Sequence, residues 1–321
     1  MSPRARTLAI YAGILAVAIA APWIAPAIVV QMAFLWLMVL FALTWDVCGG
    51  QMGYNSFGNV VFFGFGMYVC AVLQRDSGLG YFHAMFLGMG LGALASVAIA
   101  AILGPAMLGL RGPYFAIGTL GLGVAAADLA AAIEYVGAGS GMAPPVFPGG
   151  AGGSARFYYY VLMVLAMAAF LVLRWLYSRR FGLALNAIRD DEDKAEAMGL
   201  RTTRYKVVAW CIAAFFLGLA GGPTGNLAGF IDPRELAFAG PTFGVWMVLM
   251  AMLGGRGTIW GPVIGAAIFH VTQELFWTYL LGWQRVAMGL VIVLIVLFFP
   301  RGIMGWLRER WPQRFARGVA R

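Results

Sequence analysis

The chain has 321 residues, of which 62% are hydrophobic and only 11% are charged, and its net charge is +9. Soluble domains carry charge on about one quarter of their residues, so this composition excludes a soluble protein. It predicts an all-α polytopic membrane protein with a single transmembrane domain over residues 1–321. The three cysteines, Cys48, Cys70 and Cys211, lie in separate apolar runs and lack the paired spacing of a disulfide or metal framework.

Ten apolar segments are candidates for transmembrane or half-membrane helices, because about 20 residues are needed to cross a bilayer. In chain order they cover residues 8–30, 32–45, 57–73, 84–103, 113–133, 158–176, 207–222, 241–253, 260–279 and 286–300. The first segment follows Arg4 and Arg6 and resembles a secretory signal, but the many later spans favour a retained signal-anchor helix. Residues 137–153 are too rich in glycine and proline for a helix, so residues 137–156 are expected to form a periplasmic loop.

The basic residues indicate the orientation of these spans. With the amino terminus inside, only four of the 22 lysines and arginines fall outside, and the other 18 fall inside. The four outer residues are Arg75, Arg156, Arg234 and Arg285. Cytoplasmic loops carry an excess of lysine and arginine, so this distribution predicts that both termini are cytoplasmic. The basic excess is therefore a topology signal, and no nucleic-acid partner is expected.

Two glycine-rich breaks interrupt the membrane pattern, at residues 49–58 (GGQMGYNSFG) and 221–241 (GGPTGNLAGFIDPRELAFAGP). Irregular backbone at membrane depth is tolerated only where it is buried in protein or lines a wet cavity, and paired breaks are a pointer to a transport pathway. The alternative is a pair of ordinary connecting loops. The residues expected nearest a substrate pathway are Asn55, Ser56, Asn59, Gly221, Gly222 and Asn226.

Glycines four residues apart recur in three spans, at Gly88 and Gly92, Gly218 and Gly222, and Gly261 and Gly265. Such spacing lets helix backbones approach closely. Tight packing within one chain is the favoured interpretation, and a dimer seam is the alternative.

Few ionisable residues lie within the spans. His270 and Glu274 are four residues apart and share one face of a helix, so they could relay protons or bind an ion, or simply satisfy each other between helices. Asp46 lies beside a glycine break and is expected to cap a helix end, and Asp128 is expected to reach the outer interface.

Residues 179–206 form a charged segment that holds five of the 13 acids and both lysines. Charges of this density cannot lie in hydrocarbon, so the segment must project from the membrane. Asp190 is expected to cap a helix over residues 191–198, preceded by one or two helical turns, and Gly199 is expected to end that helix in a left-handed conformation. The mixture of charges with small apolar residues favours a surface that docks against another protein over a solvated loop.

Enzymatic motifs are missing from the sequence. It contains no H-E-x-x-H, no G-x-S-x-G and no Walker A loop, since neither Lys194 nor Lys206 follows a glycine. The chain is therefore expected to be non-catalytic, without a cofactor or a metal site.

The sequence resembles the LivM family of permease subunits from branched-chain amino acid ABC transporters. The resemblance rests on residues 56–68 (SFGNVVFFGFGMY), 110–117 (LRGPYFAI), 181–192 (FGLALNAIRDDE) with 195–199 (AEAMG), and 254–266 (GGRGTIWGPVIGA). It implies that residues 179–206 are the cytoplasmic coupling element, with Glu196, Ala197 and Gly199 matching the EAA…G-like core. The expected contacts with the ATPase are Arg189, Asp190, Asp191, Glu192, Glu196, Ala197 and Gly199.

The resemblance also implies the partners and the location. They are a second, LivH-like permease, two cytoplasmic ATPase subunits that hydrolyse the ATP, and a periplasmic substrate-binding protein, all at a bacterial inner membrane. Asn59 stands where such sequences often carry histidine, which bears on the substrate. The expected function is a permease of a binding-protein-dependent importer for branched-chain or related small amphiphilic amino acids. The alternative is an ion-coupled secondary transporter of small solutes.

Overall fold

The computed structural model describes residues 3–280, 282–283, 286–287, 289–290, 293 and 302–310. Over these residues the chain is helical and forms no strand, which confirms the predicted all-α polytopic class. In chain order the elements are α1 (Pro3–Ile24), η1 (Pro26–Ile28), α2 (Val29–Cys48), α3 (Asn59–Asp76), α4 (Tyr81–Met107), α5 (Pro113–Ala132), η2 (Glu134–Val136), η3 (Ala138–Ser140), α6 (Gly150–Tyr177), α7 (Arg180–Asp190), α8 (Glu192–Ala197), α9 (Thr202–Ala228), η4 (Pro233–Ala237), η5 (Gly240–Gly244), α10 (Val245–Gly254), α11 (Trp260–Tyr279) and α13 (Gly302–Arg310).

Six helical segments in the described part of the chain are long and apolar enough to cross a membrane. They are Pro26–Cys48, Tyr81–Met107, Pro113–Ala132, Gly150–Tyr177, Thr202–Ala228 and Pro233–Gly254. Three further predicted spans coincide with α1, α3 and α11, whereas the predicted span 286–300 lies largely outside the described residues. The boundary between the first two predicted spans is wrong, because the chain turns at η1 and α2 begins at Val29.

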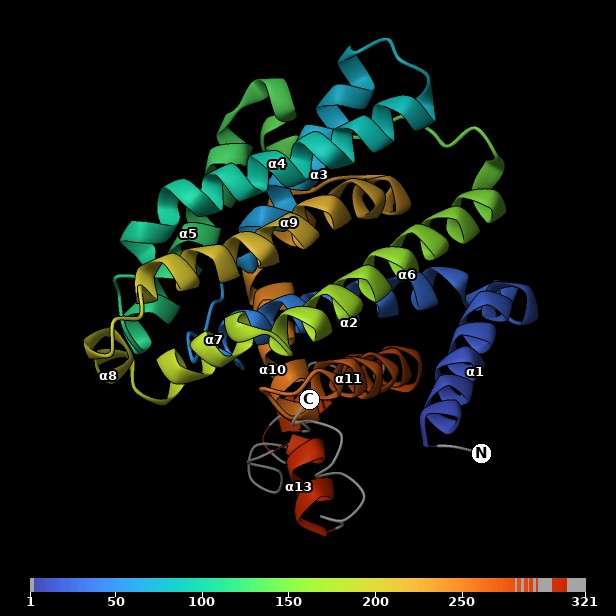
Figure 1. The fold of residues 1–321 in the computed structure, drawn as a ribbon. Helices are drawn as coiled ribbons and strands as arrows, with labels where there is room; N and C mark the ends of the chain where they lie inside the picture. Colours follow the sequence, from blue (N-terminus) through green and yellow to red (C-terminus); the bar gives the residue numbers. More distant parts are fainter. Residues whose placement is uncertain are drawn as a thin grey trace.

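Helices α3, α4 and α9 form one tightly packed group, which lies along the upper part of the molecule in Figure 1. A Cβ atom on Gly92 would come within 2.9 Å of the Gly66 Cα, and one on Gly218 within 2.8 Å of the Ala93 Cα. Only glycine allows backbones to approach this closely. The glycines of α4 and α9 therefore pack within one chain, as the favoured interpretation of their spacing predicts.

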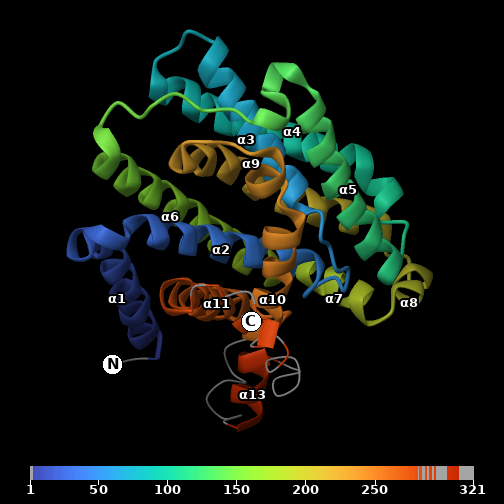
Figure 2. The ribbon, with the colours of Figure 1, turned by 180° about the vertical axis from the view of Figure 1, so that it is seen from behind.

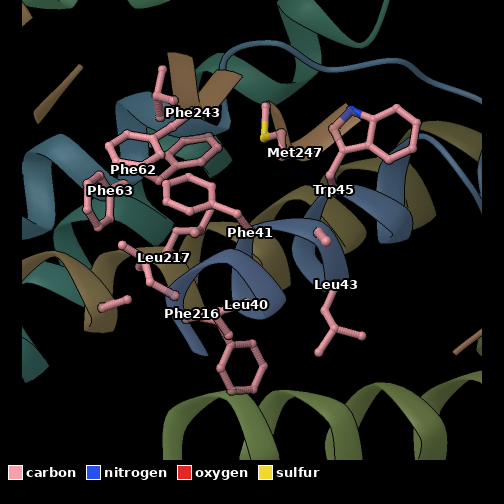
Figure 3. Packing of buried hydrophobic residues seen from close by; sticks show 14 of the residues in the cluster. Leu40, Phe41, Leu43, Trp45, Phe62, Phe63, Phe216, Leu217, Phe243 and Met247 are labelled. Carbon is pink, nitrogen blue, oxygen red and sulfur yellow. The ribbon is translucent and has the colours of Figure 1, made fainter. Parts of the chain in front are cut away.

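Helix α2 lies in the middle of the molecule and packs against α6, α9, α10 and α11. Its Phe41 ring stacks on Phe243 with 5.3 Å between centroids, and meets Phe63 of α3 edge-on at 5.0 Å. Figure 3 shows this cluster of buried rings at the junction of the helices. Because Phe243 belongs to η5, irregular backbone between α9 and α10 is anchored inside the core rather than lying on the surface.

The second predicted break begins later than the sequence analysis places it. Helix α9 continues without interruption through Gly221, Gly222 and Pro223 to Ala228, and the chain leaves the helix at Gly229 in a left-handed conformation. The correction has a packing reason, because Gly221 lies against the backbone of α3 and Gly222 against Cys70. Here the glycine pair serves close helix contact, and the irregular segment is residues 229–244, which contains two π-helical turns.

The predicted outer loop is also shorter than expected. Helix α6 begins at Gly150, so residues 150–153 are helical despite their glycine content. The remaining loop is fixed to the irregular segment by an antiparallel bridge, in which Met142 and Ile231 exchange backbone hydrogen bonds of 3.0 and 2.8 Å.

Candidate functional site: the α7–α8 projection and the segment behind it

Helices α7 and α8 form a projection at one end of the bundle, visible beside the ends of α4, α5 and α9 in Figure 1. Helix α7 is longer than the predicted turn or two. Its apolar residues Leu185 and Ile188 are buried and hold it against the body of the protein. The predicted cap of α8 is wrong by one residue. Asp191 is the N-cap, and its Oδ1 accepts a 3.0 Å hydrogen bond from the Lys194 backbone, whereas Asp190 ends α7.

The end of α8 follows the prediction. Gly199 has a φ of +88°, and its backbone N–H donates to the Glu196 carbonyl at 2.8 Å, while Leu200 donates to the Ala195 carbonyl at 3.0 Å. These bonds satisfy the carbonyls at the end of the helix and turn the chain toward α9. Gly199 is therefore the residue that sets the direction in which the chain leaves α8.

One side of the projection is exposed and mixed in character. Glu196, Ala197 and Gly199 are exposed, Met198 is 89% exposed, and Leu183 on α7 is 70% exposed. A hollow of about 530 Å³ opens beside this edge. It is lined by Phe181, Gly199, Leu200, Arg201, Arg204, Tyr205 and Val208. An exposed methionine and leucine next to a hollow lined by arginines and aromatic rings form a surface suited to contact with another protein.

One of the residues expected at this surface points inward instead, and a second, Arg189, reaches back to residue 50 while its side chain stays 38% exposed. The Glu192 side chain is only 12% exposed, and its Oε1 accepts a 2.7 Å hydrogen bond from Lys206 Nζ. Its other oxygen accepts a short hydrogen bond from the Tyr54 hydroxyl. Arg189 Nη1 donates to the Gly50 carbonyl at 3.4 Å, and this arginine also pairs with Asp190 at 3.1 Å. Sequence reasoning missed Tyr54 and Lys206, which no local pattern connects to Glu192.

The surroundings of Glu192 favour its charged form. Burial opposes ionisation, but hydrogen bonds from Lys206 and Tyr54 outweigh it and hold the pKa of this carboxyl below its usual value. Burial, together with the hydrogen bond to Glu192, raises the pKa of Tyr54 above its usual value. The site therefore contains a carboxylate and a neutral phenol at neutral pH. Since the Glu192 pKa is lowered, its stabilising contribution is lost only as the pH falls through that lowered value.

Residues 49–58 run from this end of the bundle into its interior. At the start of the segment, Asp46 accepts a 2.7 Å hydrogen bond from the Gly257 backbone, so it ties α2 to the loop before α11. Further along, the Phe57 backbone N–H donates to Thr119 Oγ1 at 3.1 Å. Thr119 lies six residues into α5, about 9 Å along that helix. The segment therefore passes the end of the bundle and reaches a point about 9 Å along α5.

The two irregular segments meet inside the protein. A Cβ atom on Gly244 would lie 3.0 Å from the Phe57 carbonyl oxygen. Close to this point, Ser56 Oγ donates a 2.9 Å hydrogen bond to Asn59 Oδ1, and both side chains are fully buried. Asn55 is exposed. The structure thus brings Asn55, Ser56 and Asn59 together where both helix breaks converge.

The remaining residues of the predicted pathway lie elsewhere. Asn226 Nδ2 donates to Gln74 at 2.8 Å, and its Oδ1 accepts from the Tyr81 hydroxyl at 2.9 Å, so it links α9 to α3 and α4. Gln74 is 15 residues along α3 from Asn59, which corresponds to about 22 Å. Gly221 and Gly222 lie in the contact between α9 and α3. These three residues therefore form helix contacts and are not brought to Asn55.

The ionisable groups of the spans have separate partners. His270 Nε2 lies 2.8 Å from the Gln31 carbonyl oxygen, and no ion pair joins it to Glu274 among the described residues. Asp128 pairs with Arg234 at 2.9 Å on the exposed surface, at the end of the bundle opposite α8.

Comparison with known proteins places the chain in a family. The family model described as "Branched-chain amino acid transport system / permease component" matches residues 27–299. The permease protein LivM of the high-affinity branched-chain amino acid transport system of Escherichia coli is 27% identical over 325 residues, covering 92% of this chain and 75% of the relative. LivM of Salmonella typhimurium is 27% identical over 299 residues, covering 85% and 68%.

A second kind of permease is also similar. LivH of Salmonella typhimurium is 30% identical over 147 residues, covering 46% of each chain. No solved structure matches the chain. The helical architecture, with two irregular segments that meet inside it, and the family match over most of the sequence lead to one conclusion. The chain belongs to the family of permease components of branched-chain amino acid transport systems.

Proposed function

We propose that this protein is a permease subunit of a binding-protein-dependent ABC importer for branched-chain or related small amphiphilic amino acids. The observation that carries the proposal is the α7–α8 projection, because an ATP-driven permease that has no Walker A loop of its own needs a surface on which a separate ATPase can act, whereas an ion-coupled transporter does not. The exposed edge at Glu196, Ala197 and Met198 is that surface. The names of the protein's relatives supply the substrate class and the transport system of the proposal.

The proposed orientation places the α8 end in the cytoplasm. The basic residues at this end include Arg111, Arg179, Arg180, Arg189, Lys194, Arg201, Arg204 and Lys206, whereas the opposite end carries Arg75, Arg156 and Arg234. An excess of basic residues on the cytoplasmic side is the usual arrangement in membrane proteins. The protein would then lie in a bacterial inner membrane with both termini inside. Two ATPase subunits would lie on the cytoplasmic side, one of them in contact with α8, and a periplasmic binding protein would approach the opposite end.

The second permease would cover the face that carries the two irregular segments. Figure 2 shows this face, on which residues 49–58 and the segment leading into α10 lie next to each other. Asn55 is exposed on it, and irregular backbone at membrane depth requires either protein or a wet path beside it. Two permeases, LivM and LivH, are named for the same kind of transport system, which favours a LivH-like partner. Substrate would pass between the two chains near Asn55, Ser56 and Asn59.

Uptake of labelled amino acids tests this function. A strain lacking the chain is expected to lose ATP-dependent uptake of leucine, isoleucine and valine, and the wild-type chain is expected to restore it. The panel also includes small polar amino acids, whose uptake is expected to be unchanged. Uptake that survives ATP depletion and stops when the proton gradient is dissipated would contradict the proposal and favour an ion-coupled secondary transporter.

A further inference from the structure

Lys206 is a buried cation at the start of α9, with its side chain only 4% exposed. Its ammonium group donates to the Leu108 carbonyl at 2.7 Å, to the Tyr54 hydroxyl at 3.0 Å and to Glu192 Oε1 at 2.7 Å. These three acceptors use all three donors of the ammonium group. They come from the end of α4, from segment 49–58 and from α8, so one side chain joins three parts of the protein to α9.

Glu192 is the side chain of α8 that reaches this cation. Its two oxygens accept from Lys206 and from Tyr54, so it contacts both α9 and segment 49–58. A buried charge that loses its partner is strongly destabilised. Movement of α8 away from the body would leave Lys206 without its carboxylate, so α8 and the segment bearing Tyr54 are held together.

The other charges of α8 cannot provide such a link. The pairs Asp193–Arg111 and Lys194–Asp191 are both at 2.8 Å, but Asp193 and Lys194 are 75% and 83% exposed. Exposed ion pairs contribute little because water and salt screen them. The Glu192–Lys206–Tyr54 cluster is therefore the strong polar connection between α8 and the interior.

Tyr54 lies directly before Asn55, Ser56 and Phe57 in the chain. The Phe57 backbone is bonded to Thr119, and its carbonyl lies against Gly244 of the other irregular segment. A displacement of Tyr54 would therefore act next to the point where the two irregular segments meet. The direct connection from α8 to that point is the hydrogen bond between the side chains of Glu192 and Tyr54, and it involves no long helix.

We infer that Glu192 is a positioning residue that, through Lys206 and Tyr54, makes segment 49–58 follow the movement of α8. Force applied to α8 by the ATPase then reaches the substrate pathway through this cluster. The inference rests on the proposed function and assigns the coupling step of that function to named side chains.

The test uses the complete transporter, purified with its ATPase subunits and reconstituted with its binding protein. It measures the ATPase subunits retained and the substrate imported per ATP hydrolysed. Glu192→Gln and Lys206→Met are each expected to lower import per ATP by about ten-fold or more while ATPase subunits are retained. Tyr54→Phe, which removes only the hydroxyl, is expected to lower it in the same direction. Asp128→Asn removes a carboxylate from an exposed ion pair at the opposite end and is the matched control, expected to import normally.

The double variant separates coupling from folding. Glu192→Gln with Lys206→Met leaves no unpaired buried charge, so the yield of folded protein is expected to recover while import per ATP stays low. Recovery of import in the double variant, or normal import per ATP in Glu192→Gln, would overturn the inference alone. Absence of ATPase subunits from the purified wild-type complex would overturn the proposed function, and the inference with it.

Discussion

Gly199→Val is expected to abolish ATP-dependent uptake while the protein still inserts into the membrane. Gly199 ends α8 with a φ of +88°, a conformation that costs a residue with a side chain about 1–3 kcal/mol, most of all a β-branched one. Valine would therefore unwind the end of α8 and displace Met198 and Glu196 from the exposed edge. Uptake of labelled leucine by cells is the measurement, with the amount of membrane-inserted protein determined in parallel.

Gly199→Asn is the matched control for this change. Asparagine also has a side chain but tolerates the left-handed conformation, so it is expected to keep the helix end and to retain uptake within about two-fold of the wild type. Since no heavy atom lies within 4 Å of a Cβ at this position, neither variant is limited by crowding inside the chain. Equal uptake by the valine and asparagine variants would show that the conformation of Gly199 is not what positions α8.

Asn55→Trp is expected to block substrate movement without preventing ATP hydrolysis. Asn55 is exposed beside the buried pair Ser56 and Asn59, where the two irregular segments meet. An indole ring placed there would fill the path proposed between the two permeases. In reconstituted transporter, leucine import is expected to fall by about ten-fold or more, because steric exclusion by a rigid side chain cannot be relieved by small shifts.

Leu94→Trp provides the comparison for Asn55→Trp. Leu94 is 62% exposed on α4, on a surface of apolar side chains that a bilayer would cover, and a tryptophan there is expected to leave import unchanged. Loss of import in both variants to the same extent would indicate a general effect of tryptophan on assembly and would contradict a pathway at Asn55.

The sequence predicts local features of the α7–α8 projection well. The turn at Gly199 is fixed by residues that are adjacent in the chain, so it follows from local stereochemistry. The capping residue is misplaced by one position because Asp190 and Asp191 have the same chemistry, and only the backbone conformation selects Asp191. The inward direction of Glu192 could not be predicted, since its partner Tyr54 lies 138 residues away in the chain.

For the helix breaks too, the features set by neighbouring residues are predicted correctly, and those set by distant contacts are not. Residues 49–58 are irregular as expected, and within them Ser56 is hydrogen-bonded to Asn59 at the start of α3, next to the exposed Asn55. The predicted break at Gly221 and Gly222 is wrong because glycine both weakens a helix and permits close packing, and the sequence alone does not reveal the neighbour. In the folded protein that neighbour is α3, which makes the two glycines part of a continuous α9.

Photo-crosslinking from the end of α8 is the most direct test of the central claim that a separate ATPase subunit binds this helix. A photoreactive amino acid at Met198, which is 89% exposed, is compared with one at Val146, which is 92% exposed on the loop at the opposite end. The account predicts that position 198 captures an ATP-hydrolysing subunit in native membranes and that position 146 does not. Capture of only lipid or water at position 198, in cells that import leucine normally, would contradict it.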